Sequence, residues 1–169
     1  VDLESTGHAL MFFDLPDVLD VFLEDGPLRK VVDSATRLLH DGQRCAIHIV
    51  TVPEPLAVRE TIEVYRDLRA REELHLGHLF INRVPLAWLD ETGRQSIRDY
   101  LDTARADDPC RPRLLLAEYL AARRDTAEKC IRGLEHDIDL PTVLLDEENA
   151  SSARIVQSIS EQLETTEGA

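Results

Sequence analysis

The chain has 169 residues, of which 43% are hydrophobic and 31% charged, a balance typical of a domain with one hydrophobic core. Nineteen basic against 33 acidic residues give a formal net charge of −14. This charge argues against a nucleic-acid partner, because phosphate binding needs basic side chains clustered on one face. No apolar run approaches the length of a membrane span, and no signal-peptide pattern is evident. The three cysteines, Cys45, Cys110 and Cys130, lie too far apart in the sequence for a disulfide framework. We therefore expect a cytoplasmic protein.

Strand-like and helix-like segments alternate along the chain, which predicts an α/β fold with a parallel sheet. Short apolar runs indicate buried strands at 45–50, 75–84 and 138–146, the last including its exit loop. Pro16 should kink or restart the first helix. Helical spacing of apolar residues predicts helices at 9–23, 28–40, 56–71, 94–104, 112–133 and 151–163, followed by a tail at 164–169.

The opening stretch, residues 2–16, carries the first candidate site. Asp2 stands at an expected strand end, which breaks into a loop at Thr6-Gly7 and then opens a helix. Ligands bind at the carboxyl ends of parallel strands, and an Asp at that edge usually faces a metal or a phosphate. The plain alternative is a structural strand–turn–helix junction in which Thr6 caps the helix.

This opening pattern, Asp-x-x-x-Thr-Gly-His-x-Leu followed by Leu-Pro, resembles switch II of the arsenical-pump ATPases, a family that includes the guided-entry ATPases of tail-anchored membrane proteins. The resemblance implies that Asp2 holds Mg²⁺ through water and that Thr6 and Gly7, with His8 in the same motif, respond to the γ-phosphate of ATP. The chain departs from the family pattern at Leu3, Ser5 and Met11.

A second similarity to the same family lies further along the chain. It consists of an apolar strand before Pro53-Glu54, a helix bearing Glu60-Thr61, and a strand ending near Asn82. The resemblance implies that Asn82 contacts the adenine ring, and an amide suits that task because it both donates and accepts hydrogen bonds. It also implies, less specifically, that Leu145 and Asp146 after the last strand touch the adenine. Asn is, however, also common at strand ends as a turn former.

The family's Gly-rich phosphate loop has no counterpart in these 169 residues, in which Lys30 and Lys129 are the only lysines. In the family that loop precedes switch II. We therefore expect a doubly wound parallel sheet of the phosphate-loop NTPase type that is incomplete at its amino side. Residues 1–163 would form the C-terminal part of one ATPase domain, with the missing segment supplied by the same or a separate chain.

The function implied by the resemblance is ATP binding and hydrolysis, with this chain inactive alone. A homodimer is expected, and a membrane-protein partner or client is left open. One alternative is a nucleotide-free interaction module derived from such an ATPase, in which Leu3, Ser5 and Met11 mark lost chemistry. A third reading, the partitioning type of phosphate-loop ATPase, is disfavoured by the Thr6-Gly7-His8 sequence.

Overall fold

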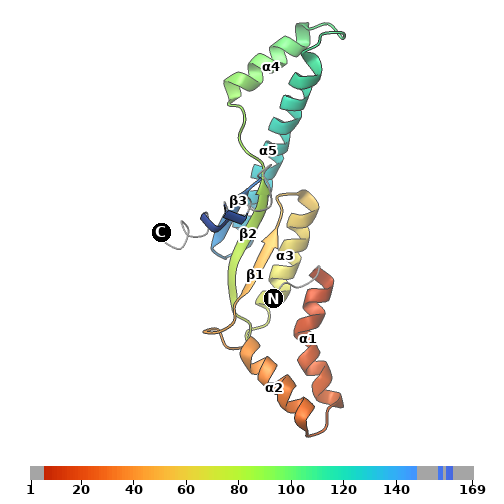
Figure 1. Cartoon of the computed structure of the whole chain (residues 1–169), viewed down its shortest axis with the longest axis vertical. Helices are drawn as coiled ribbons and strands as arrows, with labels where there is room; N and C mark the ends of the chain where they lie inside the picture. Colours follow the sequence, from red (N-terminus) through yellow and green to blue (C-terminus); the bar gives the residue numbers. More distant parts are fainter. Residues whose placement is uncertain (1–5, 148–155, 158, 162–169) are drawn as a thin grey trace.

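The sheet at the centre of the molecule has three parallel strands. The computed structural model describes residues 6–147, 156, 157 and 159–161 (Figure 1). Within them β1 (Ile47–Thr51), β2 (Leu76–Val84) and β3 (Thr142–Asp146) pair in the order β1-β2-β3. Both pairings are parallel, which confirms the predicted α/β fold with a parallel sheet.

Within residues 6–147 five helices accompany the sheet, and two of them pack on it. These two are α3 (Pro55–Arg69), between β1 and β2, and α5 (Arg111–Asp137), before β3. A helical pair lies at each end of the molecule (Figure 1). At one end α4 (Glu91–Thr103) and the first half of α5 project as an arm, and at the other α1 (Thr6–Phe22) and α2 (Pro27–Leu39) form a hairpin attached through α1 to α3.

The main hydrophobic core lies between the sheet and the two helices that cover it. Side chains alternate along a strand, so residues two apart share a face. Leu79 and Ile81 of β2 are 0% exposed, and so is Leu134 of α5. The same cluster contains Ile49 of β1 and Tyr65 and Leu68 of α3, so α3 and α5 cover one face of the sheet.

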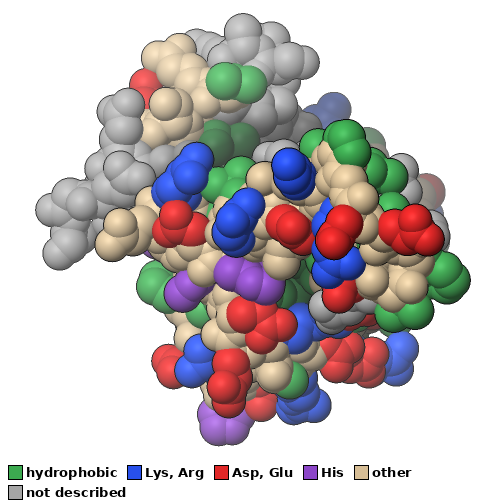
Figure 2. All heavy atoms as spheres, turned by 90° about the horizontal axis from the view of Figure 1, so that it is seen from below, with side chains coloured by type: hydrophobic (Ala, Val, Ile, Leu, Met, Phe, Trp, Pro, Cys, Tyr) green, Lys and Arg blue, Asp and Glu red, His purple; other side chains and the backbone are tan. Residues whose placement is uncertain are grey.

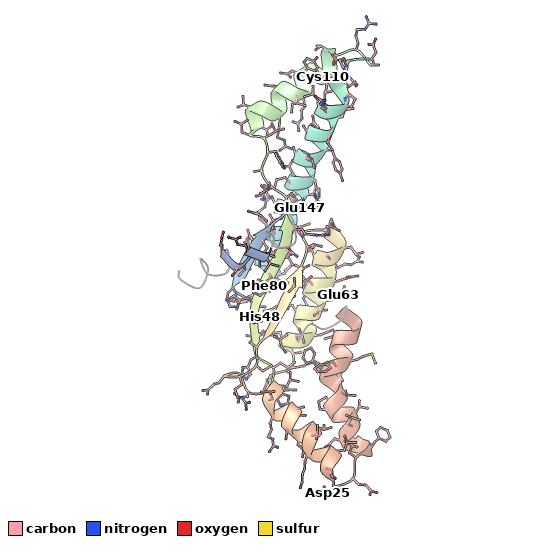
Figure 3. The ribbon with its side chains drawn as sticks, in the orientation of Figure 1. Asp25, His48, Glu63, Phe80, Cys110 and Glu147 are labelled. Carbon is pink, nitrogen blue, oxygen red and sulfur yellow. The ribbon has the colours of Figure 1, made fainter. Side chains whose placement is uncertain are left out.

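The other face of the sheet carries an aromatic group made of His48, His78 and Phe80. The His48 and His78 rings stack with centroids 5.4 Å apart, and Phe80 lies 5.6 Å from His48 (Figure 3). The His78 backbone N–H donates to His48 Nδ1 at 3.0 Å. Gly77 leaves room for this contact, because a Cβ there would meet the His48 ring at 2.5 Å. Val143 of β3, 4% exposed, pairs in register with Phe80.

Most helix boundaries follow from local chemistry. Proline lies in the first turn of α2, α3 and α5, where its missing N–H costs no helical hydrogen bond. At α4 the Asp90 side chain accepts the Gly93 N–H at 2.7 Å as an N-cap. Pro16 lies inside α1, which continues as one helix to Phe22, so of the kink or restart expected at Pro16 the restart does not occur.

The last strand begins later than the apolar run at 138–146 predicts. Ile138 instead closes α5, since its N–H donates to the Leu134 carbonyl at 2.9 Å, and its side chain fills the main core at 3% exposure. Pairing with β2 starts where the Pro141 carbonyl accepts the Leu79 N–H at 2.9 Å. The predicted helix at 151–163 lies mostly outside the described residues, and the tail at 164–169 lies entirely outside them.

The surface mixes charges and apolar groups. Viewed from the α2 end, acidic and basic side chains are interspersed (Figure 2). No described helix combines the length and apolar character needed to cross a membrane. Large apolar side chains are nevertheless exposed on α1 and α2, namely Met11, Phe12, Leu15, Val18, Val21, Phe22, Leu28, Val31 and Leu38.

Candidate functional site at the carboxyl edge of the sheet

The segments that leave the three strands meet at one edge of the sheet, beside the middle of α5. Since the strands are parallel, their carboxyl ends share this edge, where α/β proteins bind ligands. A cleft of about 360 Å³ opens here, a volume within the usual range for small-molecule sites. It is lined by Val52, Pro53, Glu54, Pro55, Arg83, Pro85, Tyr119, Ala122, Arg123, Thr126 and Ala127.

The exit of β1 forms one wall of the cleft. Pro53 is buried, and Pro55 opens α3 directly afterwards, so the chain turns within a few residues. A buried hydrogen bond of 2.7 Å between the hydroxyl groups of Thr51 and Thr61 fixes the end of β1 to α3. Of the Glu60-Thr61 pair, only the threonine faces the core, and Glu60 is exposed.

The exit of β2 is a bulge built from Asn82 and Arg83. Arg83 has a φ of 58°, a left-handed conformation that is uncommon outside glycine. Its backbone N–H donates to the Asn82 side-chain oxygen at 2.8 Å, and the register with β3 shifts between Ile81 and Val84. Bulges of this kind redirect side chains next to functional sites. Here Arg83 lines the cleft, whereas by strand alternation Asn82 shares the opposite face with Phe80.

The middle of α5 binds the exits of the other two strands through adjacent arginines. Arg123 donates to both carboxylate oxygens of Glu147, at 2.7 and 3.2 Å, just beyond β3 (Figure 3). Arg124 donates to the Pro85 carbonyl beyond β2 and pairs with Glu128 at 2.8 Å. The side-chain hydrogen bond to Glu147 raises the pKa of Arg123 above its ordinary value, so this guanidinium remains charged.

The predicted adenine residues all lie at this edge. Asn82 is near the carboxyl end of β2, and Asp146 is the last residue of β3, paired in register with Val84. Leu145 is 7% exposed, whereas Asp146 is exposed. The structure thus brings Asn82, Leu145 and Asp146 to neighbouring strand ends, and contact with a base stays a prediction.

Of the predicted switch residues, the structure describes the backbone of Thr6, Gly7 and His8. Asp2 lies outside the described residues. The backbone of Thr6, Gly7 and His8 forms the first turn of α1, so the helix begins three residues before the predicted start at residue 9. Their assignment to a nucleotide switch therefore remains a prediction.

Sequence reasoning missed Arg83, Arg123, Arg124 and Glu147. The hydrogen bonds of Arg123 and Arg124 reach residues 24 and 39 positions away, a distance over which a single sequence gives no pairing signal. The one clue to Arg123 and Arg124 in the sequence is that they are two consecutive arginines in a helix whose apolar residues follow helical spacing. Arg83 gave none, because residues with positive φ are expected mainly at glycine or asparagine.

The described residues do not by themselves form a metal site. No group of three or more His, Cys, Asp or Glu side chains in this part of the molecule could hold an ion. The cysteines are free thiols in different environments: Cys110 is exposed at the far end of the arm, and burial raises the pKa of Cys130 (Figure 3). The cleft, by contrast, suits part of an organic ligand, since apolar walls are combined with two arginines.

Comparison with known proteins finds similarity to bacterial ATPases. No protein-family model matches the chain. It is 36% identical over 83 residues to "ATPase BagA" of Mycobacterium tuberculosis and, to the same extent, to "Putative ATPase Mb3704" of Mycobacterium bovis. The match covers 49% of this chain and 24% of each relative's length. The chain is therefore similar to a segment of proteins named as ATPases, over about a quarter of their length.

Proposed function

We propose that this chain supplies the adenine side and switch II of an ATPase of the arsenical-pump or guided-entry type, built on a doubly wound sheet of the phosphate-loop NTPase type. The observation that carries the proposal is the bulge at Asn82 and Arg83, next to a ligand-sized cleft and beside the end of β3. Its position at the carboxyl edge of a parallel sheet is where α/β proteins bind nucleotides. Similarity to proteins named as ATPases supports the choice of ligand.

Asn82 is proposed to read the base. Its side-chain oxygen accepts the Arg83 N–H, but a carbonyl oxygen has a second lone pair, and the amide nitrogen has two N–H groups. The same amide can therefore accept from an exocyclic amine and donate to a ring nitrogen. Leu145 and Asp146, at the end of the neighbouring strand, would complete this side of the base.

Residues 2–8 are proposed to serve the phosphate end. In phosphoryl transfer to water, catalysis is mostly positioning and charge stabilisation around the γ-phosphate. Asp2 would hold Mg²⁺ through a water molecule, and Thr6, Gly7 and His8 would respond to the presence of the γ-phosphate. Bound Mg²⁺ would neutralise charge on the phosphates. The phosphate-loop lysine would come from a segment outside this chain.

The first experiment is to measure the mass of the native protein in its source cells with an antibody raised to this chain. All later assays use the protein at that length. Asp2→Asn is then expected to lower ATP hydrolysis at saturating ATP by about 100-fold or more, as loss of a transition-state contact does. Asp25→Asn, in the exposed loop between α1 and α2, is the matched control and should leave the rate unchanged. Equal rates for Asp2→Asn and the wild type would contradict the switch assignment.

One observation favours the second candidate, a nucleotide-free interaction module. The hairpin of α1 and α2 exposes large apolar side chains, among them Phe12, Val21 and Phe22, and exposed apolar surface of this kind often marks an interaction site. If the family resemblance holds, this apolar surface of α1 and α2 would bind a second copy of the chain or a membrane-protein client. Equilibrium dialysis with ATP separates the candidates, since the module would bind no nucleotide.

A further inference from the structure

We propose that Arg123 and Arg124 are positioning residues for the nucleotide base. By binding Glu147 after β3 and the Pro85 carbonyl after β2, they fix the ends of the two strands that carry Asn82, Leu145 and Asp146 relative to each other. This inference rests on the proposed function, because it assigns a role within the same nucleotide site.

The two arginines complete a closed ring of contacts. They are consecutive residues of one helix, yet each reaches the exit of a different strand. Those exits are also joined to each other, since the Glu147 backbone N–H donates to the Val84 carbonyl at 2.8 Å. Neither exit can therefore move away from α5 without breaking a contact made by Arg123, Arg124 or Glu147.

The ring also encloses the strained part of the site. A residue such as Arg83, held at a positive φ, needs surrounding contacts that keep it there. The Asn82 side chain contacts Arg83 on one side, and Arg124 holds the Pro85 carbonyl two residues further on. Arg124 is thus placed to hold the bulge that presents Asn82 to the base.

The exposure of these side chains argues for a role in positioning more than in stability. Arg123 and Glu147 are 36% and 34% exposed, and ion pairs at this exposure contribute little to folding because water screens them. Their geometry is nevertheless specific, since a guanidinium that binds both carboxylate oxygens fixes orientation as well as distance. These directional contacts therefore hold the exit of β3 against α5 while contributing little to the stability of the fold.

The test measures ATP hydrolysis and the preference for ATP over GTP in single and paired variants. Arg123→Gln and Glu147→Gln are each expected to raise the KM for ATP about 10-fold with kcat within about two-fold, the pattern of lost uniform binding. The preference for ATP over GTP should fall in parallel, which a purely structural role would not cause. The double variant should lose no more than either single variant, because both remove one pair.

Two further variants keep the test decisive. Exchanging the charges, Arg123→Glu with Glu147→Arg, should recover part of the ATP affinity. Arg113→Gln removes an exposed arginine from the arm portion of the same helix and should change nothing. An unchanged KM and base preference in Arg123→Gln, with a wild type that hydrolyses ATP, would overturn this inference alone. A wild type that neither binds nor hydrolyses ATP would overturn the proposed function and this inference with it.

Discussion

Truncation of Leu134 tests whether α5 is anchored to the sheet as described. Leu134 is 0% exposed and lies in the same cluster as Leu79 and Ile81. Leu134→Ala removes three carbons, and at about 0.8 kcal/mol for each buried methylene the transfer cost is about 2.4 kcal/mol. Incomplete collapse of the cavity raises the expected loss of unfolding free energy to about 3–4 kcal/mol. For a chain of this size the melting temperature should fall by about 10 °C.

The measurement is urea and thermal denaturation followed by circular dichroism at 222 nm. The matched control is Leu116→Ala, the same substitution on the same helix at a side chain that is 56% exposed, where the expected change is within about 0.5 kcal/mol. Equal losses in the two variants would refute the reasoning, because they would show that the two halves of α5 are packed alike.

Two further predictions concern buried or stacked polar groups. Thr61→Val should cost about 1–3 kcal/mol in urea denaturation, because it leaves the buried Thr51 hydroxyl with only a long contact of 3.5 Å to the Val52 carbonyl. Thr51→Val together with Thr61→Val should cost less than the sum of the single changes, and strict additivity would contradict this. Burial and the neighbouring His78 lower the pKa of His48 below its ordinary value of 6.5, so the folded state binds this proton less readily than the unfolded chain does. The free energy of unfolding should therefore fall as the pH drops below about 6.5. His48→Asn, which keeps an acceptor near the Nδ1 position, should make the dependence of unfolding free energy on pH less steep. An equally steep dependence in the variant would refute the assignment of this effect to His48.

The order and type of the elements could be predicted because each has a strong local signal. The helix expected at 112–133 is observed as α5, Arg111–Asp137, with Pro112 in its first turn and apolar residues at helical spacing. The apolar run at 45–50 corresponds to β1, Ile47–Thr51. Asn82 was correctly expected near the carboxyl end of a strand.

The geometry of the site could not be predicted, because it depends on contacts between distant residues and on an unusual backbone conformation. Nothing in Asn82-Arg83-Val84 requires a positive φ, since the sequence contains no glycine there. The apolar character of Ile138 indicated a strand, yet this residue closes a helix and fills the core. An apolar residue is expected to be buried, but its burial does not show whether it belongs to a strand or to the end of a helix that packs under the sheet.

The length of α5 has a mechanical consequence. Its 27 residues span about 40 Å at 1.5 Å per residue, and no proline interrupts the helix after its first turn. The carboxyl half is clamped against the sheet, whereas the amino half stands free of it beside α4 (Figure 1). Such a helix resists bending, so a tilt of its amino half would pivot near Arg123 and Arg124. A tilt of about 5° there displaces the far end by about 1.6 Å over the roughly 18 Å of free helix. A partner that displaces the helix end near Cys110 would therefore also act on the two strand exits, through the contacts of Arg123 and Arg124.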